Sequence, residues 1–237
     1  MLQQLLKKCG IYYAKRRYMP VGFDWLHDVQ RLRPSGVDCV LDVGANEGQT
    51  ALAVTQYFRN ARIHSFEPVT HTYERLVNNV RGHANISCHQ HALGAVRGTA
   101  TMAVGTNSLV NRLASDAMPV CAGQTAEIVN IETIDSFCGQ QGIGRVGILK
   151  IDVEGAEQRV IEGASRMLSD GRIDFAFVEI GFCARDPGHS YAADVMRQLD
   201  ESGLGLFALY DYCRLMPPQY VQEEMLPVFA NALFARR

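Results

Sequence analysis

One short stretch, residues 40–51 (VLDVGANEGQTA), most constrains how this chain can fold. An apolar run ending at Val43 has the composition of a strand buried on both faces. A turn with Gly44 and Gly48 follows, and apolar residues then recur at helical spacing as far as Phe58. Strand, glycine turn and helix in this order open a nucleotide-binding α/β sheet. The turn alone is weak evidence, because glycines also end strands for purely structural reasons.

The acid in this turn separates two kinds of ligand. The dinucleotide fingerprint G-x-G-x-x-G faces a pyrophosphate, whereas this chain reads D-x-G-x-x-x-G, with Asp42 at the start and Asn46 in place of a middle glycine. A carboxylate repels a phosphate but attracts an ammonium or a sulfonium group. S-adenosylmethionine carries both cations, so the spacing favours it over NAD.

The composition is typical of one soluble α/β domain. The 237 residues are 47% hydrophobic and 20% charged, with a net charge of −2, which argues against nucleic acid as a partner. No apolar run reaches the length of a membrane span, and the start of the chain lacks the apolar core of a signal peptide. The seven cysteines form no C-x-x-C pair, so we expect reduced thiols in a cytoplasmic protein.

We divide the chain into an N-terminal helical cap, residues 1–36, and a main domain, residues 37–237, that together form one compact unit. Residues 1–34 read as helical, with lysines and arginines between the apolar positions, and a second short helix is expected over residues 24–31. A basic amphipathic helix can lie on a membrane surface or bind an anionic substrate. We favour a helix that caps the sheet or covers a cleft.

The second strand, expected over residues 61–67, ends in an acid. Glu67 precedes Pro68 and so lies at the carboxyl end of the strand next to the first, where open α/β sheets bind ligands. A carboxylate in this place can accept both hydroxyls of an adenosine ribose. The alternative is a solvated loop acid, but the joint spacing with Asp42 favours the ligand role.

The middle of the chain is less informative. A third strand is expected over residues 85–91, where His89 and His91 share a face. That spacing could bind a metal, but with no third ligand we interpret them as ordinary strand histidines. Strands over residues 99–104 and 126–131 flank an irregular stretch, residues 106–124, which either recognises a substrate or only connects the strands.

Two further buried strands also end in acids. Residues 146–152 (VGILKID) end at Asp152, with Glu154 close behind, and residues 173–180 (IDFAFVEI) carry Glu179 near their end. A helix over residues 156–168 follows the first of them, and Glu157 is expected only to complement its dipole. After a helix over residues 191–202, strands over 204–211 and 230–236 should close the sheet as a pair.

Six motifs in this order resemble the FkbM family of S-adenosylmethionine-dependent methyltransferases. They are VLDVGANEGQTA, FEP (66–68), HALG (91–94), IETIDSF (131–137), KIDVEGAE (150–157) and the closing NALFARR. The resemblance runs from about Val37 to the C-terminus. It implies the α/β class I methyltransferase fold, a Rossmann-like, doubly wound seven-stranded sheet of order 3-2-1-4-5-7-6 with strand 7 antiparallel. The main domain is then the methyltransferase domain.

The resemblance also implies the site. The cofactor-binding residues are then those of the glycine turn, the ribose acid and the adenine side, namely Asp42, Gly44, Ala45, Asn46, Gly48, Thr50, Glu67, Pro68, Leu93 and Asp152. Asp152 falls near the transferred methyl. An acceptor alcohol must lose a proton, and by position the candidate catalytic acids are Asp152, Glu154 and Glu179. Two such acids could hold Mg²⁺ through oxygen ligands, an arrangement that we do not favour, and no metal ligand is assigned.

The predicted function is O-methylation of a hydroxyl on a small molecule or a sugar, in secondary metabolite or polysaccharide biosynthesis. Two alternatives are a methyltransferase-fold protein that only binds or scaffolds, against which Asp42, Glu67 and Asp152 together argue, and an NAD-dependent dehydrogenase, which the D-x-G-x-x-x-G spacing disfavours. The acceptor and the oligomeric state cannot be derived from the sequence.

Overall fold

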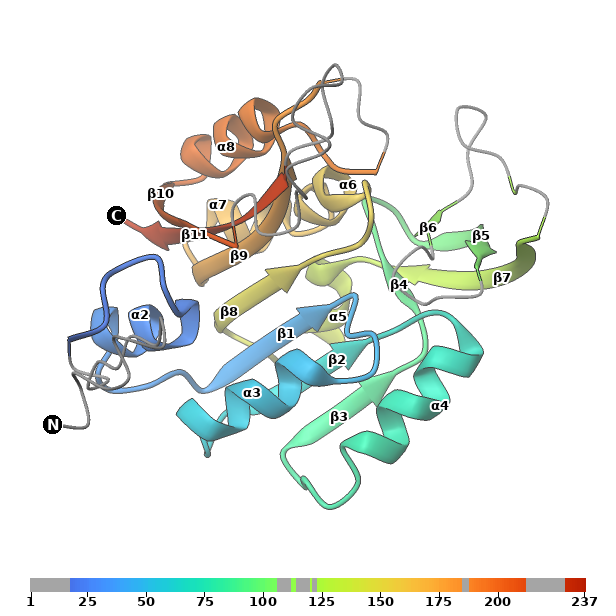
Figure 1. The fold of residues 1–237 in the computed structure, drawn as a ribbon, viewed down its shortest axis with the longest axis horizontal. Coiled ribbons are helices and arrows are strands. Elements are labelled where there is room, and N and C mark those ends of the chain that lie inside the picture. Colours follow the sequence, from blue (N-terminus) through green and yellow to red (C-terminus); the bar gives the residue numbers. More distant parts are fainter. Residues whose placement is uncertain (1–17, 106–111, 114–119, 121–122, 185–187, 212–228) are drawn as a thin grey trace, which may run out of the picture.

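A computed structural model describes residues 18–105, 112–113, 120, 123–184, 188–211 and 229–237 (Figure 1). Residues 1–17, the first half of the stretch 1–34 that is expected to be helical, therefore lie outside the described residues, as does most of the stretch 106–124. Within the described residues, no helix is long and apolar enough to cross a membrane.

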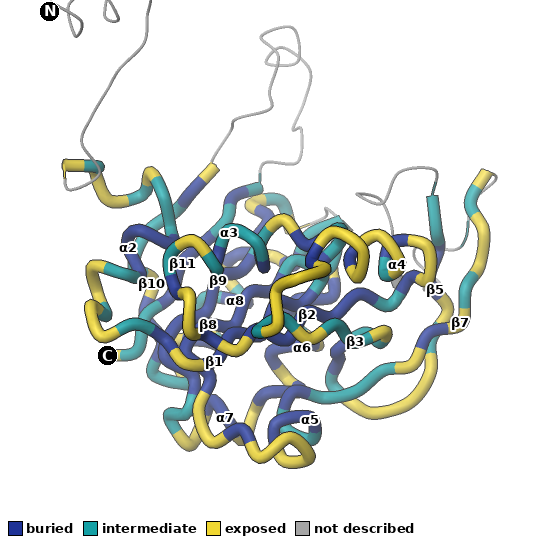
Figure 2. Tube along the Cα trace, turned by 90° about the horizontal axis from the view of Figure 1, so that it is seen from below, coloured by how far each residue is buried: buried dark blue, intermediate teal, exposed yellow. Residues whose placement is uncertain are grey.

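The main sheet has the predicted order and orientation. Its seven strands, from one edge to the other, are β3 (Ile86–His89), β2 (Arg62–Phe66), β1 (Cys39–Val43), β8 (Val146–Ile151), β9 (Ile173–Gly181), β11 (Phe229–Arg236) and β10 (Leu204–Tyr210). All neighbours pair in parallel except β11, which is antiparallel to both β9 and β10. Every residue of β1 and β8 is buried, as expected for central parallel strands (Figure 2). The predicted class I fold is confirmed.

Helices cover both faces of this sheet. They are α2 (Trp25–Leu32), α3 (Gln49–Tyr57), α4 (Thr70–Asn79), α5 (Ile134–Gln141), α6 (Glu157–Glu162), α7 (Ser165–Ser169) and α8 (Ala192–Glu201). Leu41 of β1 packs into an apolar cluster with residues of α5 to α8, whereas its neighbour Val40 packs with residues of α2 and α3. Successive side chains of the strand therefore serve opposite layers.

The helix α2 packs on the same face of the sheet as α3, in an apolar cluster that also contains Ile148 of β8 and Phe177 of β9. Trp25 stacks on Phe177, with 4.2 Å between ring centroids, and Phe177 is in register with Lys150 near the end of β8. The N-cap of α2, Asp24, accepts a hydrogen bond from the backbone of His27. The division of the chain at residue 36 stays a prediction.

The expected helix over residues 156–168 is wrong, because the structure has two shorter helices. A Cβ at Gly163 would lie 2.1 Å from the carbonyl oxygen of Gly94, so the chain approaches another backbone closely at the break. Asp135 then accepts hydrogen bonds from the backbone N–H groups of Arg166 and Met167 at 2.8 and 2.9 Å. An acid from α5 therefore caps the start of α7.

A second, four-stranded sheet was not foreseen. Its order is β4 (Ala92–Leu93), β7 (Thr125–Glu132), β5 (Gly98–Val104) and β6 (Arg112–Leu113). The strands expected over 99–104 and 126–131 are β5 and β7, but they pair with each other and not with the main sheet. This sheet lies beyond the carboxyl ends of the main strands (Figure 1), so it can form a wall of a cleft there.

A buried lysine joins the two central strands at this same edge. Lys150 of β8 is paired in register with Asp42 of β1, and its Nζ lies 3.5 Å from Asp42 and 3.4 Å from Asp152. Nζ also donates to the carbonyl oxygens of Val43 and Gly44, at 3.3 and 2.7 Å. Burial alone would lower the pKa of Lys150, but Asp152 and Asp42 outweigh it and raise this pKa, so the lysine stays charged.

Replacing Lys150 with methionine should lower the free energy of unfolding by about 3–5 kcal/mol, because Asp42 is then buried without a counter-charge. Denaturant-induced unfolding measures this loss. The double variant Asp42→Asn/Lys150→Met removes both charges and should recover part of it. A loss below about 1 kcal/mol in the single variant would contradict the ion pair.

Candidate functional site

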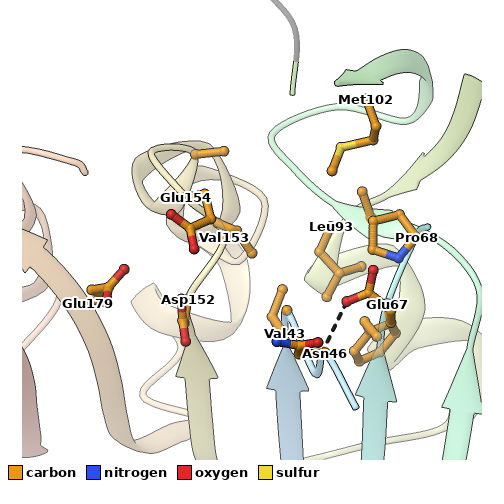
Figure 3. Close-up of a pocket in the computed structure, with 14 residues that line it drawn as sticks. Val43, Asn46, Glu67, Pro68, Leu93, Met102, Asp152, Val153, Glu154 and Glu179 are labelled. Carbon is orange, nitrogen blue, oxygen red and sulfur yellow. Dashed lines mark hydrogen bonds between the residues drawn. The ribbon is translucent and has the colours of Figure 1, made fainter. Parts of the chain in front are cut away.

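A pocket lies at the carboxyl ends of β1, β2, β8 and β9, where parallel α/β sheets bind ligands. Figure 3 shows its walls, with the acids after β8 and in β9 on one side and Glu67, Leu93 and Met102 on the other. The lining residues are Val43, Gly44, Asn46, Phe66, Glu67, Pro68, Ala92, Leu93, Met102, Asp152, Val153, Glu154, Ala156 and Glu179.

The glycine turn lines this pocket with backbone atoms at Gly44, a residue without a side chain. Gly44 has a φ of +73°, and a Cβ there would lie 1.8 Å from the carbonyl oxygen of Asp152, so only glycine fits. The N–H groups of Gly44 and Ala45 both donate to the carbonyl oxygen of Phe66, at 3.1 and 2.9 Å. The turn is therefore held between the ends of β2 and β8.

Glu67 is buried and fixed by two backbone N–H groups. One carboxylate oxygen accepts from Asn46, as Figure 3 shows, and the other from Val69, both at 3.1 Å. Burial raises the pKa of Glu67 to about 7, against these two hydrogen bonds, which lower it. The side-chain oxygen of Asn46 is buried without a hydrogen-bond partner in the described part of the chain. This wall therefore has an unused acceptor and a carboxylate that can still accept hydroxyl groups.

The opposite wall is acidic. Asp152 and Glu154 follow β8, and Glu179 comes from β9 (Figure 3). Burial and, to a lesser extent, the neighbouring carboxylates of Asp152, Glu154 and Glu157 together raise the pKa of Glu179 to about 9. The side chain of Asp152 is 39% exposed and paired with Lys150. A ligand with an uncharged ring at one end and a cation at the other would match these two walls.

The structure brings together eight of the residues named from the sequence, Gly44, Asn46, Glu67, Pro68, Leu93, Asp152, Glu154 and Glu179. It does not bring four others to the pocket wall. Asp42 is fully buried, and its charged neighbour in the structure is Lys150. Ala45 packs with Leu76, and Gly48 and Thr50 belong to the start of α3.

Sequence reasoning missed three contributors. Lys150 had a visible signal, a charge inside an otherwise apolar buried strand. Met102 had none, because it reaches the pocket only through the second sheet. Glu157 is not a simple dipole acid: it is fully buried and accepts hydrogen bonds from the backbone N–H groups of Val153, Gly155 and Ser190, each at 3.1 Å. It holds the loop that carries Asp152 and Glu154.

The rings of His64, His89 and His91 pack together beside the pocket. His89 stacks on His64 and Phe66, and burial, together with His64 and His91, lowers the pKa of His89 to about 4. In the part of the chain that the structure describes, no group of three or more His, Cys, Asp or Glu side chains could hold a metal ion.

Comparison with known proteins agrees with this geometry. The family model described as "Methyltransferase FkbM domain" matches residues 42–204. "Methyltransferase 1" of Beauveria bassiana (strain ARSEF 2860) is 27% identical over 142 residues, 52% of this chain and 57% of the relative. "Methyltransferase sdnD" of Sordaria araneosa is 26% identical over 175 residues, 62% of this chain and 67% of the relative. The chain thus spans little more than half of the first relative.

A solved structure described as StiE O-MT has the same fold. It aligns with a TM-score of 0.50 and 10% identity over 89% of this chain and 72% of that one. The family model covers well over half of the sequence and includes the glycine turn, Glu67 and all three pocket acids. The chain therefore belongs to the methyltransferase FkbM family, as its motifs indicated.

Proposed function

We propose that this protein transfers the methyl group of S-adenosylmethionine to a hydroxyl group of a small molecule or a sugar. One observation carries the proposal: a buried, backbone-fixed Glu67 and three carboxylates line opposite walls of one pocket beside a glycine turn. Family membership and the name of the aligned O-MT structure support it.

The residues present fit this cofactor. Glu67 would accept the ribose hydroxyls, and the Leu93–Met102 wall would cover the adenine. The backbone at Gly44 and the partnerless side-chain oxygen of Asn46 would face the methionine part. The acidic wall suits its ammonium and sulfonium charges. When bound, the cofactor supplies an electrophilic methyl group.

The chain's own residues supply placement and proton transfer. An acceptor oxygen must be held roughly 3 Å from the methyl carbon and in line with sulfur. Asp152, Glu154 and Glu179 lie on the wall where such a hydroxyl could donate hydrogen bonds, and a carboxylate can take its proton. These carboxylates favour a hydroxyl group as the methyl acceptor. The proposal also includes a cytoplasmic location and no nucleic-acid partner.

The cofactor proposal predicts pH-dependent binding. S-adenosylhomocysteine, the demethylated product, should bind about tenfold more tightly at pH 8 than at pH 6, because lowering the pH through the value of about 7 for Glu67 protonates the ribose acceptor. Isothermal titration calorimetry measures both constants. In Glu67→Gln, affinity should fall about ten- to a hundredfold and lose most of this pH dependence. Tight binding of NAD, with none of S-adenosylhomocysteine, would refute the proposal.

The acceptor proposal predicts a specific role for Asp152. Mass spectrometry should find a gain of one methyl group in a panel of hydroxylated metabolites and sugars incubated with the protein and S-adenosylmethionine. With that acceptor, Asp152→Asn should reduce turnover about ten- to a hundredfold, because a charge-assisted hydrogen bond that orients the hydroxyl is weakened. Affinity for S-adenosylhomocysteine should stay within a few-fold. Full turnover in the variant would exclude Asp152 from the reaction.

A further inference from the structure

An imidazole lies beside one of the pocket acids. His189 precedes α8, and its Nε2 lies 3.5 Å from a carboxylate oxygen of Glu179. Both side chains are largely buried, 15% and 13% exposed. Glu179 is among the residues that line the pocket and His189 is not.

The ring is held in this place from several sides. It stacks on Phe229 with 4.8 Å between ring centroids and 9° between planes. A Cβ at Gly181 would lie 2.8 Å from the Cβ of His189, so glycine at the end of β9 makes room for this approach. The next residue, Ser190, accepts from the Gly181 N–H at 2.9 Å and donates its own N–H to Glu157 at 3.1 Å.

The same buried acid fixes both parts of the arrangement. One carboxylate oxygen of Glu157 holds Ser190, and the other holds Val153 and Gly155. The position of His189 is thereby tied to the loop that carries the other pocket acids. An imidazole is the side chain that exchanges protons most readily near neutral pH.

Glu179 differs from Asp152 in its surroundings. The charged groups around Glu179 are Asp152 and Glu154 after β8, Glu157 at the start of α6, Lys150 in β8, and His189. Asp152 has the buried Lys150 as its partner, whereas Glu179 has an imidazole that can take up a proton. Because burial and the three acids raise the pKa of Glu179 to about 9, this carboxyl needs a proton acceptor before it can act as a base at neutral pH.

We propose that Glu179 and His189 act together as the base of the reaction, with Glu179 accepting the proton of the acceptor hydroxyl and His189 receiving it from Glu179. This inference rests on the proposed methyl transfer. The acceptor oxygen loses its proton to Glu179 and gains the methyl group, whose bond to sulfur breaks with both electrons left on sulfur. Before this step Glu179 gives the proton that it holds at rest to Nε2 of His189, which releases it to solvent, and the proton taken from the acceptor later leaves by the same route. Glu179 touches the substrate, and His189 acts through it.

The first test is the pH dependence of a variant. In His189→Gln, the proton of Glu179 has lost its acceptor, so turnover at pH 7 should fall about ten- to a hundredfold. Near pH 9.5 most of the wild-type turnover should return. The acceptor is the one found in the methylation screen, and His71→Gln, an exposed histidine, is the matched control. A merely structural role predicts a loss that high pH does not repair, and that result would overturn the dyad.

The second test needs no acceptor. NMR titration of isotope-labelled protein follows the ring signals of His189, which are identified by their loss in His189→Gln. In Glu179→Gln the pH at which these signals move should change, while those of His71 should not. An unchanged His189 curve, in a variant that still binds S-adenosylhomocysteine, would refute the dyad and leave the proposed function standing. Loss of S-adenosylhomocysteine binding by the wild type would instead refute the proposed function.

Discussion

The buried Lys150, between Asp42 and Asp152, is the interaction on which the rest of the site depends. Two acids and one base meet where β1 and β8 end, and the lysine also binds the carbonyl oxygens at the start of the glycine turn. Removing charges from water costs several kcal/mol each, so such a group is stable only when all its members are present. The lysine thus fixes the distance between the strand that supplies the turn and the strand that supplies the acids.

The shape of the pocket follows from that fixed distance. Gly44 comes so close to the backbone of Asp152 that no Cβ fits between them. The N–H groups of Gly44 and Ala45 in the turn both donate hydrogen bonds to the carbonyl oxygen of Phe66. Glu67, one residue further on, binds back to the turn through Asn46. The ends of three adjacent strands are therefore joined by backbone contacts, so Glu67 and the acids on the opposite wall keep a constant spacing.

The sequence predicts those features of the fold and the site that depend on the order of the strands and on where each strand ends. It does not predict contacts between segments that are far apart in the chain. Glu67 and Asp152 could be found because an acid at the end of a buried parallel strand must face the ligand edge. The partner of Asp42 could not, because the register of β1 with β8 appears only on folding. Met102 arrives from a separate sheet, and His189 depends on Gly181 and Phe229. The continuous helix expected over 156–168 failed because helical periodicity does not reveal Gly94 pressing on Gly163.

The charge distribution of the pocket explains why several ion-pair and hydrogen-bond contacts hold its acids and the loops that carry them. Asp152, Glu154 and Glu179 share one wall, and like charges in a partly buried site repel one another. The fold counters this repulsion with Lys150. Glu157 adds to the negative charge, but it accepts hydrogen bonds from backbone N–H groups of the surrounding loops and so holds these loops in place. Among the residues that line the pocket, Glu67 and Glu179 have raised pKa values, and they lie on opposite walls. A cationic ligand in the pocket would reduce the repulsion among Asp152, Glu154 and Glu179. The electrostatic energy of these acids should therefore be lower when such a ligand is bound than when the pocket is empty.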